Sequence, residues 1–383
     1  MKKKIIRITT VPLSLGGLLT GQIKFISNYY EIIGVSSTGH GNLSLQNYGN
    51  KEGVKVIPVE MTRKITPLKD LKAVWKLYKI FKKEKPFIVH SHTPKAGTLA
   101  MLASYMAKVP HRLHTIAGLP LLEAIGSKRR LLDIVEKMTY FCATKIYPNS
   151  HGLRDIIIKN KYAKSDKLKV LANGSSNGID IHHFDPSLYN AKENLKLKDS
   201  LDIKTEDFVF LFIGRLVKDK GINELVEAFN SLSEENKKIK LLLVGGYESD
   251  LDPVLPNTEY LIKTSPNIIS VGWQNDVRPF IAISDVLTFP SYREGFPNVV
   301  MQAGAMGIPC IVTNINGCNE IIIEGKNGTI IPVKDTKQLS TKMLQIANRE
   351  FLFDAKVCRD LITKKYDRQI VWDAILSEYN SLN

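Results

Sequence analysis

Short apolar runs recur along the first half of the chain, and polar or helix-forming stretches separate them. The runs are rich in Ile and Val and comprise KIIRITTVP at 4–12, EIIGVSS at 31–37, GVKVIPV at 53–59, PFIVHSH at 86–92 and HRLHTIAG at 111–118. Runs of this length and composition are typical of buried strands. Because strands alternate with helical segments, the pattern predicts βαβ units around a parallel sheet.

Residues 68–85 show the helical period clearly. One face of this predicted helix carries the apolar residues Leu71, Val74, Trp75, Tyr78 and Phe81. Another face carries Lys69, Lys72, Lys76, Lys79 and Lys83. The apolar face is expected to pack on the sheet. The lysine face has two interpretations, a solvated surface or a contact with an anionic membrane.

The second half of the chain restarts the same alternation. Its predicted strands are DFVFLFIGRL at 207–216, KIKLLLVGG at 238–246, NIISVGW at 267–273, DVLTFPS at 285–291 and CIVTN at 310–314. Helices are predicted at 221–232 and 298–307. Residues 172–200 lie between the two blocks and are rich in Gly, Ser, Asn and Asp, which is typical of a linker. We therefore predict two tandem doubly wound, Rossmann-like α/β domains whose parallel sheets face a central cleft. Ligands of such sheets bind at the carboxyl ends of the strands.

Composition narrows the class of protein. The chain has 383 residues, which favours two domains, and 44% of them are hydrophobic. No apolar run is long enough for a transmembrane helix, and the basic N-terminus is interpreted as a first strand rather than a signal peptide. The four cysteines show no C-x-x-C spacing, which argues against a zinc site or a disulfide framework and favours a reducing cytoplasm.

The net charge of +15 is unevenly distributed. Residues 1–200 contain 33 Lys and Arg against 14 Asp and Glu, whereas the remainder contains 20 against 24. This asymmetry indicates an anionic partner for the first half, which could be a nucleic acid, a membrane surface or a phosphorylated substrate.

The first candidate motif is IGRLVKDKG at 213–221. A strand ends at Ile213, Gly214 turns the chain, and Arg215 and Lys220 follow before a helix. Two cations at the end of a strand suit a diphosphate, because Arg binds phosphate as a fork and Lys as a point charge. The alternative is a pair of ordinary surface cations.

The second motif is REGFPNVVMQAGAMGIPCIVTNINGCNEII at 293–322. Pro297 suits a helix start, and the helix that begins near Asn298 offers free backbone N–H groups to an anion. Glu294 in the preceding loop could accept hydrogen bonds from sugar hydroxyls, and Gln302 lies one turn into the helix. The alternative is a surface Glu and a satisfied helical Gln.

Two further motifs follow strands in the first half. Gly16 and Gly17 of SLGGL are expected to form a turn that lets the backbone approach a ligand, although the dinucleotide-binding fingerprint is absent. In VHSHTPKAG at 89–97, strand alternation points His90 and His92 the same way. A histidine that binds a substrate hydroxyl is favoured over a metal pair, and a buried core histidine stays open.

Residues 116–141 combine an apolar loop with a cationic cluster. The loop contains Leu119, Leu121 and Leu122, and the cluster is Lys128, Arg129 and Arg130. Apolar residues beside cations suit an anionic membrane interface. The alternative is a buried loop beside a solvated basic helix.

Together these motifs resemble the retaining GT-B glycosyltransferases of the family-4 type, in particular those that build bacterial capsular polysaccharide, exopolysaccharide or lipid-linked oligosaccharide. The resemblance rests on GRL…KG, EGFPNVVMQAGAMGIP and E-I-I…G-x-N-G-x-x-I/V-P, with the Gly16–Gly17 turn, VHSHTPKAG and YPNS in the expected order. It covers essentially the whole chain.

The resemblance implies a nucleotide-sugar donor, with UDP as the usual nucleotide, and neither a cofactor nor an essential metal. Arg215 and Lys220 would hold the diphosphate, Glu294 the transferred sugar, and His92 its hydroxyls. The remaining donor-binding residues would be Gly16, Gly17, Gly214, Trp273, Gly295, Phe296, Pro297, Asn298, Val299 and Gln302. Gln302 departs from the family, which has a second Glu there for the ribose; Gln keeps one acceptor oxygen and adds donors.

The implied domains are an acceptor-binding domain at 1–190 and a nucleotide-sugar-binding domain at 191–365, with a helix at 366–383 that crosses back onto the first. The chemistry would be transfer with retention by a front-face route, because no second carboxylate suggests itself as a nucleophile. A polyprenyl-diphosphate-linked or saccharide acceptor at the cytoplasmic face of the membrane would explain the basic first half.

Two other functions fit parts of the pattern. A UDP-sugar 2-epimerase of the same shape would need no acceptor, but the pairing of GRL…K with EGFPN speaks against it. A basic nucleic-acid-binding protein would explain the charge but neither Glu294 nor the second domain, and no nucleic-acid-binding motif is recognisable.

Overall fold

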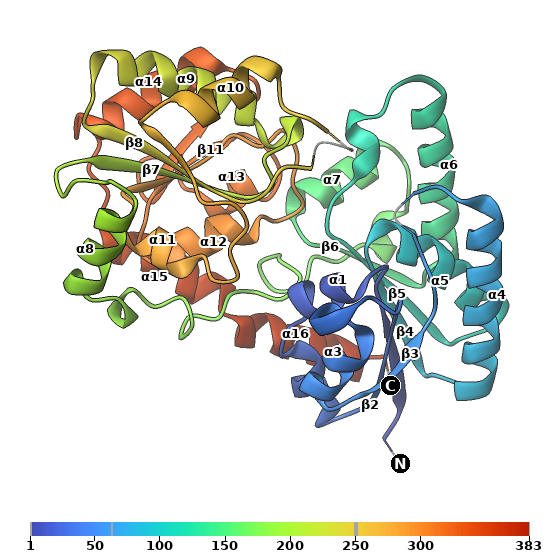
Figure 1. The fold of residues 1–383 in the computed structure, drawn as a ribbon. Helices are drawn as coiled ribbons and strands as arrows, with labels where there is room; N and C mark the ends of the chain where they lie inside the picture. Colours follow the sequence, from blue (N-terminus) through green and yellow to red (C-terminus); the bar gives the residue numbers. More distant parts are fainter. Residues whose placement is uncertain (1, 63, 249–251, 383) are drawn as a thin grey trace. The chain divides into compact units, whose positions relative to one another are not determined.

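The computed structural model of the protein describes residues 2–62, 64–248 and 252–382 (Figure 1). The chain divides into two compact units. The N-terminal unit comprises Met1–Gly178 and Arg368–Asn383, and the C-terminal unit comprises Ile179–Asp367. Residues 179–190, which the sequence analysis assigns to the first domain, therefore belong to the C-terminal unit.

The N-terminal unit is built on a sheet of six parallel strands in the order β3-β2-β1-β4-β5-β6. The strands are β1 (Lys4–Ile8), β2 (Glu31–Ser36), β3 (Lys55–Pro58), β4 (Ile88–His92), β5 (His111–Ile116) and β6 (Lys145–Pro148). In the centre of the sheet, Ile6 of β1 lies beside Ile33 of β2 and Val89 of β4. These strands are buried on both faces because helices cover both faces of the sheet, and β1 and β4 carry buried polar residues among their apolar ones.

Helices cover the two faces of this sheet in separate groups. One core contains Ile6 and Ile8 and is closed by α4 (Pro67–Glu84), α5 (Pro94–Met106), α6 (Gly126–Cys142) and α7 (His151–Lys159). The other contains Ile5 and Ile88 and is closed by α1 (Pro12–Leu18), α2 (Gln22–Ser27), α3 (Leu45–Glu52) and α16 (Arg368–Asn380). Figure 1 shows α4, α5 and α6 side by side, with α5 in the middle.

The C-terminal unit repeats the arrangement with strand order β12-β11-β10-β7-β8-β9. Its strands are β7 (Phe208–Ile213), β8 (Ile239–Val244), β9 (Ile268–Ser270), β10 (Val286–Phe289), β11 (Cys310–Thr313) and β12 (Gly328–Ile331). Numbered within each unit, both sheets have the order 3-2-1-4-5-6. The strand order reverses beside the first strand in each unit, which is where such sheets bind ligands.

The helices of the C-terminal unit surround one continuous core. They are α8 (Ala191–Ser200), α9 (Ile222–Glu235), α10 (Pro256–Thr264), α11 (Arg278–Ala282), α12 (Asn298–Ala305), α13 (Cys318–Ile321), α14 (Thr336–Ala347) and α15 (Ala355–Tyr366). The predicted strands and the helices at 221–232 and 298–307 are therefore confirmed, and the two-sheet fold class with them.

Three details of the predicted elements are wrong. The linker at 172–200 contains α8, which begins because the Asn190 side chain accepts a hydrogen bond of 2.9 Å from the Glu193 backbone N–H. The short strands β6 and β12 were not predicted as strands. The buried face of α4 consists of Ala73, Val74, Leu77 and Phe81, whereas Leu71 and Trp75 are exposed.

Among the described residues, none of the helices has the length and hydropathy that a membrane span requires.

Candidate functional site

The carboxyl edge of the C-terminal sheet begins with a close backbone contact after β7. Gly214 follows β7, and Gly245 follows the neighbouring β8 with φ +152°. A Cβ atom added at Gly245 would lie 1.7 Å from the Gly214 carbonyl oxygen, so only glycine fits at this position. Arg215, which follows Gly214 in the chain, is exposed and forms an ion pair with Glu248.

Lys220 lies between β7 and α9 in the short 3-10 helix Lys218–Lys220. Its ammonium group forms an ion pair with the Glu294 carboxylate, and both side chains are only 16% exposed. The Lys220 nitrogen also lies 5.5 Å from the centre of the Phe289 ring at the end of β10. The structure thus brings together two predicted site residues that are 74 positions apart in the sequence.

The loop that carries Glu294 is held by hydrogen bonds on three sides. The Ser291 hydroxyl donates to Glu294 Oε1 at 3.0 Å. The Asn316 side-chain amide donates to the Glu294 carbonyl oxygen. The Arg293 guanidinium donates to the Asp219 carboxylate at 2.7 Å, which ties the loop to the segment that contains Lys220. Glu294 and Lys220 are therefore positioned by the same framework.

The start of α12 lies directly after this loop. Pro297 is the residue before the first helical residue, Asn298, with φ −74° and ψ 114°, so the predicted helix start is confirmed and Pro297 lies one position earlier than a first helical residue. A Cβ atom at Gly317 would lie 2.5 Å from the Gly295 carbonyl oxygen, so the next loop packs tightly under this turn. The backbone N–H groups of the first turn of α12 carry partial positive charge, which suits an anion.

The other predicted donor-binding residues of this unit differ in their exposure. The Phe296 side chain is buried and packs against the Tyr366 ring at 5.3 Å, so only its backbone could meet a ligand. Trp273 is exposed in the loop after β9. Val299 and Gln302 are half-buried on α12, and no described residue forms a hydrogen bond with the Gln302 side-chain amide.

This arrangement suits a diphosphate linked to a sugar. Lys220 and the first turn of α12 supply positive charge at the carboxyl edge of the sheet, and Glu294 supplies hydrogen-bond acceptors beside them. An arriving phosphate can replace Glu294 as the partner of Lys220, because both are oxygen anions. The carboxylate is then free to accept hydrogen bonds from hydroxyl groups.

In the N-terminal unit, the predicted glycine turn at Gly16 and Gly17 is wrong. Both residues lie inside α1, which begins at Pro12 directly after β1. A Cβ atom at Gly17 would have no atom within 4 Å, and one at Gly16 would make ordinary contact with Tyr48. Neither glycine is needed for the backbone conformation in this structure. Both line a hollow of about 490 Å³ between α1 and α3.

His92 ends β4 and is buried in a polar cluster that also contains Arg7, Gln22 and His90. Arg7 of β1 donates to His92 Nε2 from Nε at 3.2 Å and from Nη2 at 3.0 Å. Because this nitrogen accepts, a neutral His92 carries its proton on Nδ1, and Nδ1 is buried with no described hydrogen-bond partner. The His90 ring stacks on His92 at 4.3 Å, which confirms that the two side chains point the same way.

Arg7 is a feature that sequence reasoning missed. Its side chain is fully buried, donates to Gln22 Oε1 at 2.6 Å, and leaves Nη1 without a described partner. No described carboxylate forms an ion pair with it. The sequence shows only an arginine that interrupts an apolar run; the signal was that strand alternation places Arg7 on the same face as His90 and His92 of the neighbouring strand.

Burial shifts the titration of the histidines in this cluster. Burial, reinforced by the Arg7 charge, lowers the pKa of His92 well below its usual value, and burial lowers the pKa of His90 in the same way. Burial also lowers the pKa of His114, which contacts Ser91 on the opposite face of the sheet, to about 4. Thr93 follows His92 with φ +72°, which is strained for a β-branched residue. The cluster is therefore neutral at its histidines and rigidly held.

The predicted acceptor or membrane loop is mostly buried. Leu119 and Leu121 belong to the core of the N-terminal unit, and Leu122 packs against it, so these side chains do not form an exposed apolar loop. Arg129 forms an ion pair of 2.9 Å with Asp133 and donates to the Leu121 carbonyl oxygen at 3.0 Å. Only Lys128 and Arg130 of the cluster are exposed.

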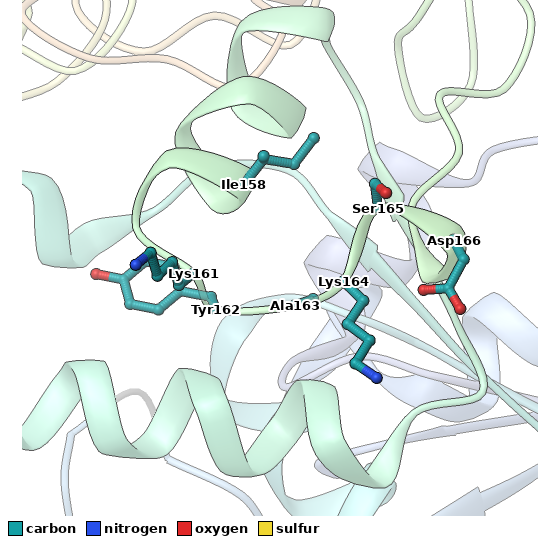
Figure 2. A pocket seen from close by; sticks show the side chains of 7 residues that line it. All are labelled: Ile158, Lys161, Tyr162, Ala163, Lys164, Ser165 and Asp166. Atoms are coloured by element: carbon teal, nitrogen blue, oxygen red, sulfur yellow. The ribbon is translucent and has the colours of Figure 1, made fainter.

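One hollow of the surface lies away from the carboxyl edges of the strands. It has a volume of about 630 Å³ and follows the C-terminal end of α7, where the chain has returned to the amino edge of the sheet. Figure 2 shows Lys161 and Tyr162 on one side and Ser165 and Asp166 on the other, without convergent polar groups. Ligands of α/β sheets bind at the opposite edge. The described residues also contain no cluster of three or more His, Cys, Asp or Glu arranged to hold a metal ion.

Two family models match the chain. Residues 193–368 match "Glycosyl transferases group 1", and residues 38–174 match "Glycosyl transferase 4-like domain". The two matches fall on the C-terminal and N-terminal units respectively.

Relatives match the chain over most of its length. A capsular polysaccharide biosynthesis glycosyltransferase of Staphylococcus aureus, CapM, is 35% identical over 99% of this chain and 97% of its own length. A UDP-Gal:α-D-GlcNAc-diphosphoundecaprenol α-1,3-galactosyltransferase of Escherichia coli is 30% identical over 80% of this chain and 78% of its own length.

Solved structures share the fold. A glycosyltransferase of Rickettsia africae has a TM-score of 0.79 at 21% identity and covers 100% of this chain and 98% of its own. HepE (Alr3699) of Anabaena, in complex with UDP, has a TM-score of 0.78 at 18% identity and covers 100% of both chains. The chain belongs to the group 1 glycosyl transferases and has their GT-B fold, so the resemblance that the motifs indicated is confirmed.

Proposed function

We propose that this glycosyltransferase moves a sugar, with retention of anomeric configuration, from a UDP-sugar to a hydroxyl of a polyprenyl-diphosphate-linked or saccharide acceptor in cell-surface polysaccharide synthesis. The observation that carries the proposal is the Lys220–Glu294 ion pair beside the start of α12, at the carboxyl edge of the C-terminal sheet. The S. aureus and E. coli relatives, which act in capsule synthesis and on a diphosphoundecaprenol acceptor respectively, support the acceptor class.

The donor site would use the geometry of the C-terminal unit. Lys220, Arg215 and the first turn of α12 hold the diphosphate, and each currently paired cation exchanges a carboxylate for a phosphate. Glu294, released from Lys220, accepts hydrogen bonds from the donor sugar. UDP is supported by its presence in the complex of the HepE neighbour. Gln302 would accept one hydrogen bond from the ribose where the resemblance expects a carboxylate.

The chemistry would rely on stabilising the leaving group. As the bond between the anomeric carbon and the diphosphate breaks, negative charge grows on the phosphate oxygen, and Lys220 and Arg215 stabilise it. The acceptor hydroxyl attacks on the same face and passes its proton to that oxygen. Glu294 stabilises the positive charge that develops on the sugar ring. No metal is needed for this step, because the two cations and the helix start supply the positive charge.

His92 is proposed to donate from Nδ1 to a hydroxyl of the donor sugar. Its Nδ1 proton has no partner among the described residues, and the hydrogen bonds from Arg7 to Nε2 fix that tautomer. The neutral ring suits a donor that must not lose its proton between pH 6 and 8.

The N-terminal unit would meet the acceptor at the cytoplasmic face of the membrane. It holds 31 Lys and Arg against 12 Asp and Glu. On α4, the exposed side chains of Leu68, Leu71 and Trp75 lie among exposed lysines. Apolar side chains flanked by lysines suit the surface of an anionic bilayer. This face of α4 replaces the buried loop at Leu119–Leu122 as the proposed contact.

Nucleotide binding and product analysis test the proposal. We expect UDP and a UDP-sugar to raise the melting temperature in the presence of a chelator, and GDP and ADP to have little effect. The Arg215→Ala variant should lose the shift. Transfer to an undecaprenyl-diphosphate-linked sugar should give an α-linked product from an α-linked donor by NMR. Release of a free epimer would instead identify a 2-epimerase, and an inverted product would exclude the front-face route.

A further inference from the structure

An apolar cavity of about 260 Å³ lies in the N-terminal unit beside the carboxyl edge of its sheet. Its walls come from the starts of α4 and α5 and from one face of α6, and its apolar lining includes Leu99, Leu121, Leu131, Leu132 and Val135. Leu99 and Leu121 are buried and form the floor, whereas Leu131 is 46% exposed. A cavity of about 150 Å³ lined by such residues can hold benzene. This one therefore has room for more than one five-carbon unit.

The cavity wall also carries charge at one end. Lys95, the second residue of α5, lines the cavity and forms an ion pair with Asp70 of α4. The carboxylate of Asp70 also accepts a hydrogen bond of 3.1 Å from the Thr66 hydroxyl, so it keeps a partner when Lys95 turns to a phosphate. Lys128 is exposed one helical turn before Leu131 and Leu132, on the same face of α6. Two cations thus lie next to an apolar wall.

The cavity adjoins the polar cluster of the N-terminal unit through a single short segment. Pro94 lines the cavity and lies two residues after His92, which ends β4. Glu136 of α6 lines it on the other side, and burial raises the pKa of this carboxyl, which makes the wall less polar. An apolar chain in the cavity would therefore have its charged end close to the carboxyl edge of the sheet.

We propose that this cavity binds the first isoprene units of the acceptor's lipid, with the diphosphate at Lys95 and Lys128. The inference rests on the proposed function, which names a polyprenyl-diphosphate-linked acceptor. In an isoprenyl diphosphate the hydrocarbon begins at the phosphate oxygen, so the anion and the apolar chain are adjacent, as the cation and the apolar wall are here. In a glycerophospholipid the glycerol separates them.

Binding of geranyl diphosphate by calorimetry, below its micelle concentration, tests this site. The wild-type protein should bind it at least about tenfold more tightly than inorganic diphosphate, because ten carbons leave water. The Val135→Phe variant fills the cavity and should weaken geranyl diphosphate about tenfold without changing the affinity for inorganic diphosphate. The Ile134→Phe variant is the matched control, because Ile134 is the adjacent, exposed residue on α6 and does not line the cavity; its affinity should equal that of the wild type.

Several outcomes would overturn the inference. Equal affinities for geranyl and inorganic diphosphate, or equal effects of the two phenylalanine variants, would exclude the cavity. If n-decyl diphosphate binds as tightly as geranyl diphosphate, the cavity accepts any ten-carbon chain, including the acyl chain of a bilayer lipid, and is not selective for isoprene units. If Val135→Phe does not fold, Leu131→Gln makes the same test at the exposed mouth. UDP binding is measured on the same samples, so a failure of the cavity with intact UDP binding leaves the proposed function in place.

Discussion

The two units have the same strand order, yet they present different chemistry at the carboxyl edge. In the C-terminal unit, Lys220 and Glu294 form an ion pair that is partly open to solvent, so each partner can be exchanged for a ligand. In the N-terminal unit, Arg7 and His92 are buried and hydrogen-bonded to each other. One scaffold therefore supports an exchangeable ion pair and a fixed site in which a buried arginine is hydrogen-bonded to a neutral histidine.

Charge follows the same division. The N-terminal unit has a net charge of +19 and the C-terminal unit of −4. The strongly basic unit is not the one proposed to hold the nucleotide diphosphate, where a few cations at strand ends suffice. Its excess charge is spread over exposed helices such as α4, which suits a long-range attraction to an anionic surface rather than one bound phosphate.

The largest expected effect comes from removing the exchangeable ion pair. The Lys220→Ala variant should lower kcat about 10²–10³-fold, because the developing phosphate charge loses its principal cation. Its melting temperature should also fall, because both side chains are only 16% exposed and the variant leaves the Glu294 carboxylate without its cation. Turnover is measured with a saturating UDP-sugar. The exposed Lys218, two residues earlier, is the control, and Lys218→Ala should stay within about twofold. A loss of only a few-fold in Lys220→Ala would remove Lys220 from the chemistry.

The next largest effect tests how tightly the C-terminal edge is built. The Gly245→Ala variant should lower the free energy of unfolding by about 3 kcal/mol or more, because its Cβ would collide with the Gly214 carbonyl oxygen at a φ that L-residues rarely adopt. Urea titration measures the change. At Gly246 a Cβ meets nothing within 4 Å, so Gly246→Ala should cost less than about 1 kcal/mol. Equal costs at the two positions would contradict the close approach of the strands.

A pH titration should separate the buried histidines of the N-terminal unit from the ion pair of the C-terminal unit. Because the pKa values of His90, His92 and His114 are lowered in the folded state, the unfolded chain binds protons first as the pH falls below about 6.5. Each histidine should then cost about 1.4 kcal/mol of stability per pH unit, down to its folded pKa, which is about 4 for His114.

Calorimetry between pH 7.5 and 5 measures this loss. The His114→Gln variant should reduce the slope. A melting temperature that is constant over this range would show that the histidines titrate normally.

The smallest effect concerns Gly17 of the N-terminal unit, where an added Cβ atom would have no atom within 4 Å. The Gly17→Ala variant should raise the free energy of unfolding by about 0.5–1 kcal/mol, because Gly17 lies in α1 with free space around it. The measurement is a urea titration, with UDP affinity determined alongside. A loss of UDP affinity without a gain of stability would favour the close approach to a diphosphate that the family resemblance implies.

The fold was largely predictable because apolar runs and helical periods are local signals. The strands from β1 to β5 and from β7 to β11 correspond to runs that the sequence shows directly. The turn at Gly16 and Gly17 was mispredicted because glycine permits a turn without requiring one, and Pro12 at the start of α1 favours the helix. The strands β6 and β12 were missed although each has four residues, as many as β10 and β11, which were predicted.

The site was predictable only in part, because its key contacts are not local. Glu294 and Lys220 could be selected singly from their motifs, but nothing in the sequence shows that they pair across 74 residues. The predicted membrane loop at Leu119 and Leu121 shows that a local signal can also mislead. Its apolar residues suit an interface or a core equally well, and only packing against the sheet shows that they are core.

The helix α16 gives the order in which the chain can be completed during synthesis. It belongs to the N-terminal unit, and Tyr379 from this helix hydrogen-bonds to His90 Nδ1 at 2.5 Å in the buried polar cluster. The residues of α16 leave the ribosome after the whole C-terminal unit. The N-terminal unit therefore begins to emerge first but is completed last. Until α16 is made, the face of the sheet that α1, α2 and α3 also cover lacks this fourth helix, and the uncovered apolar surface can bind chaperones or aggregate.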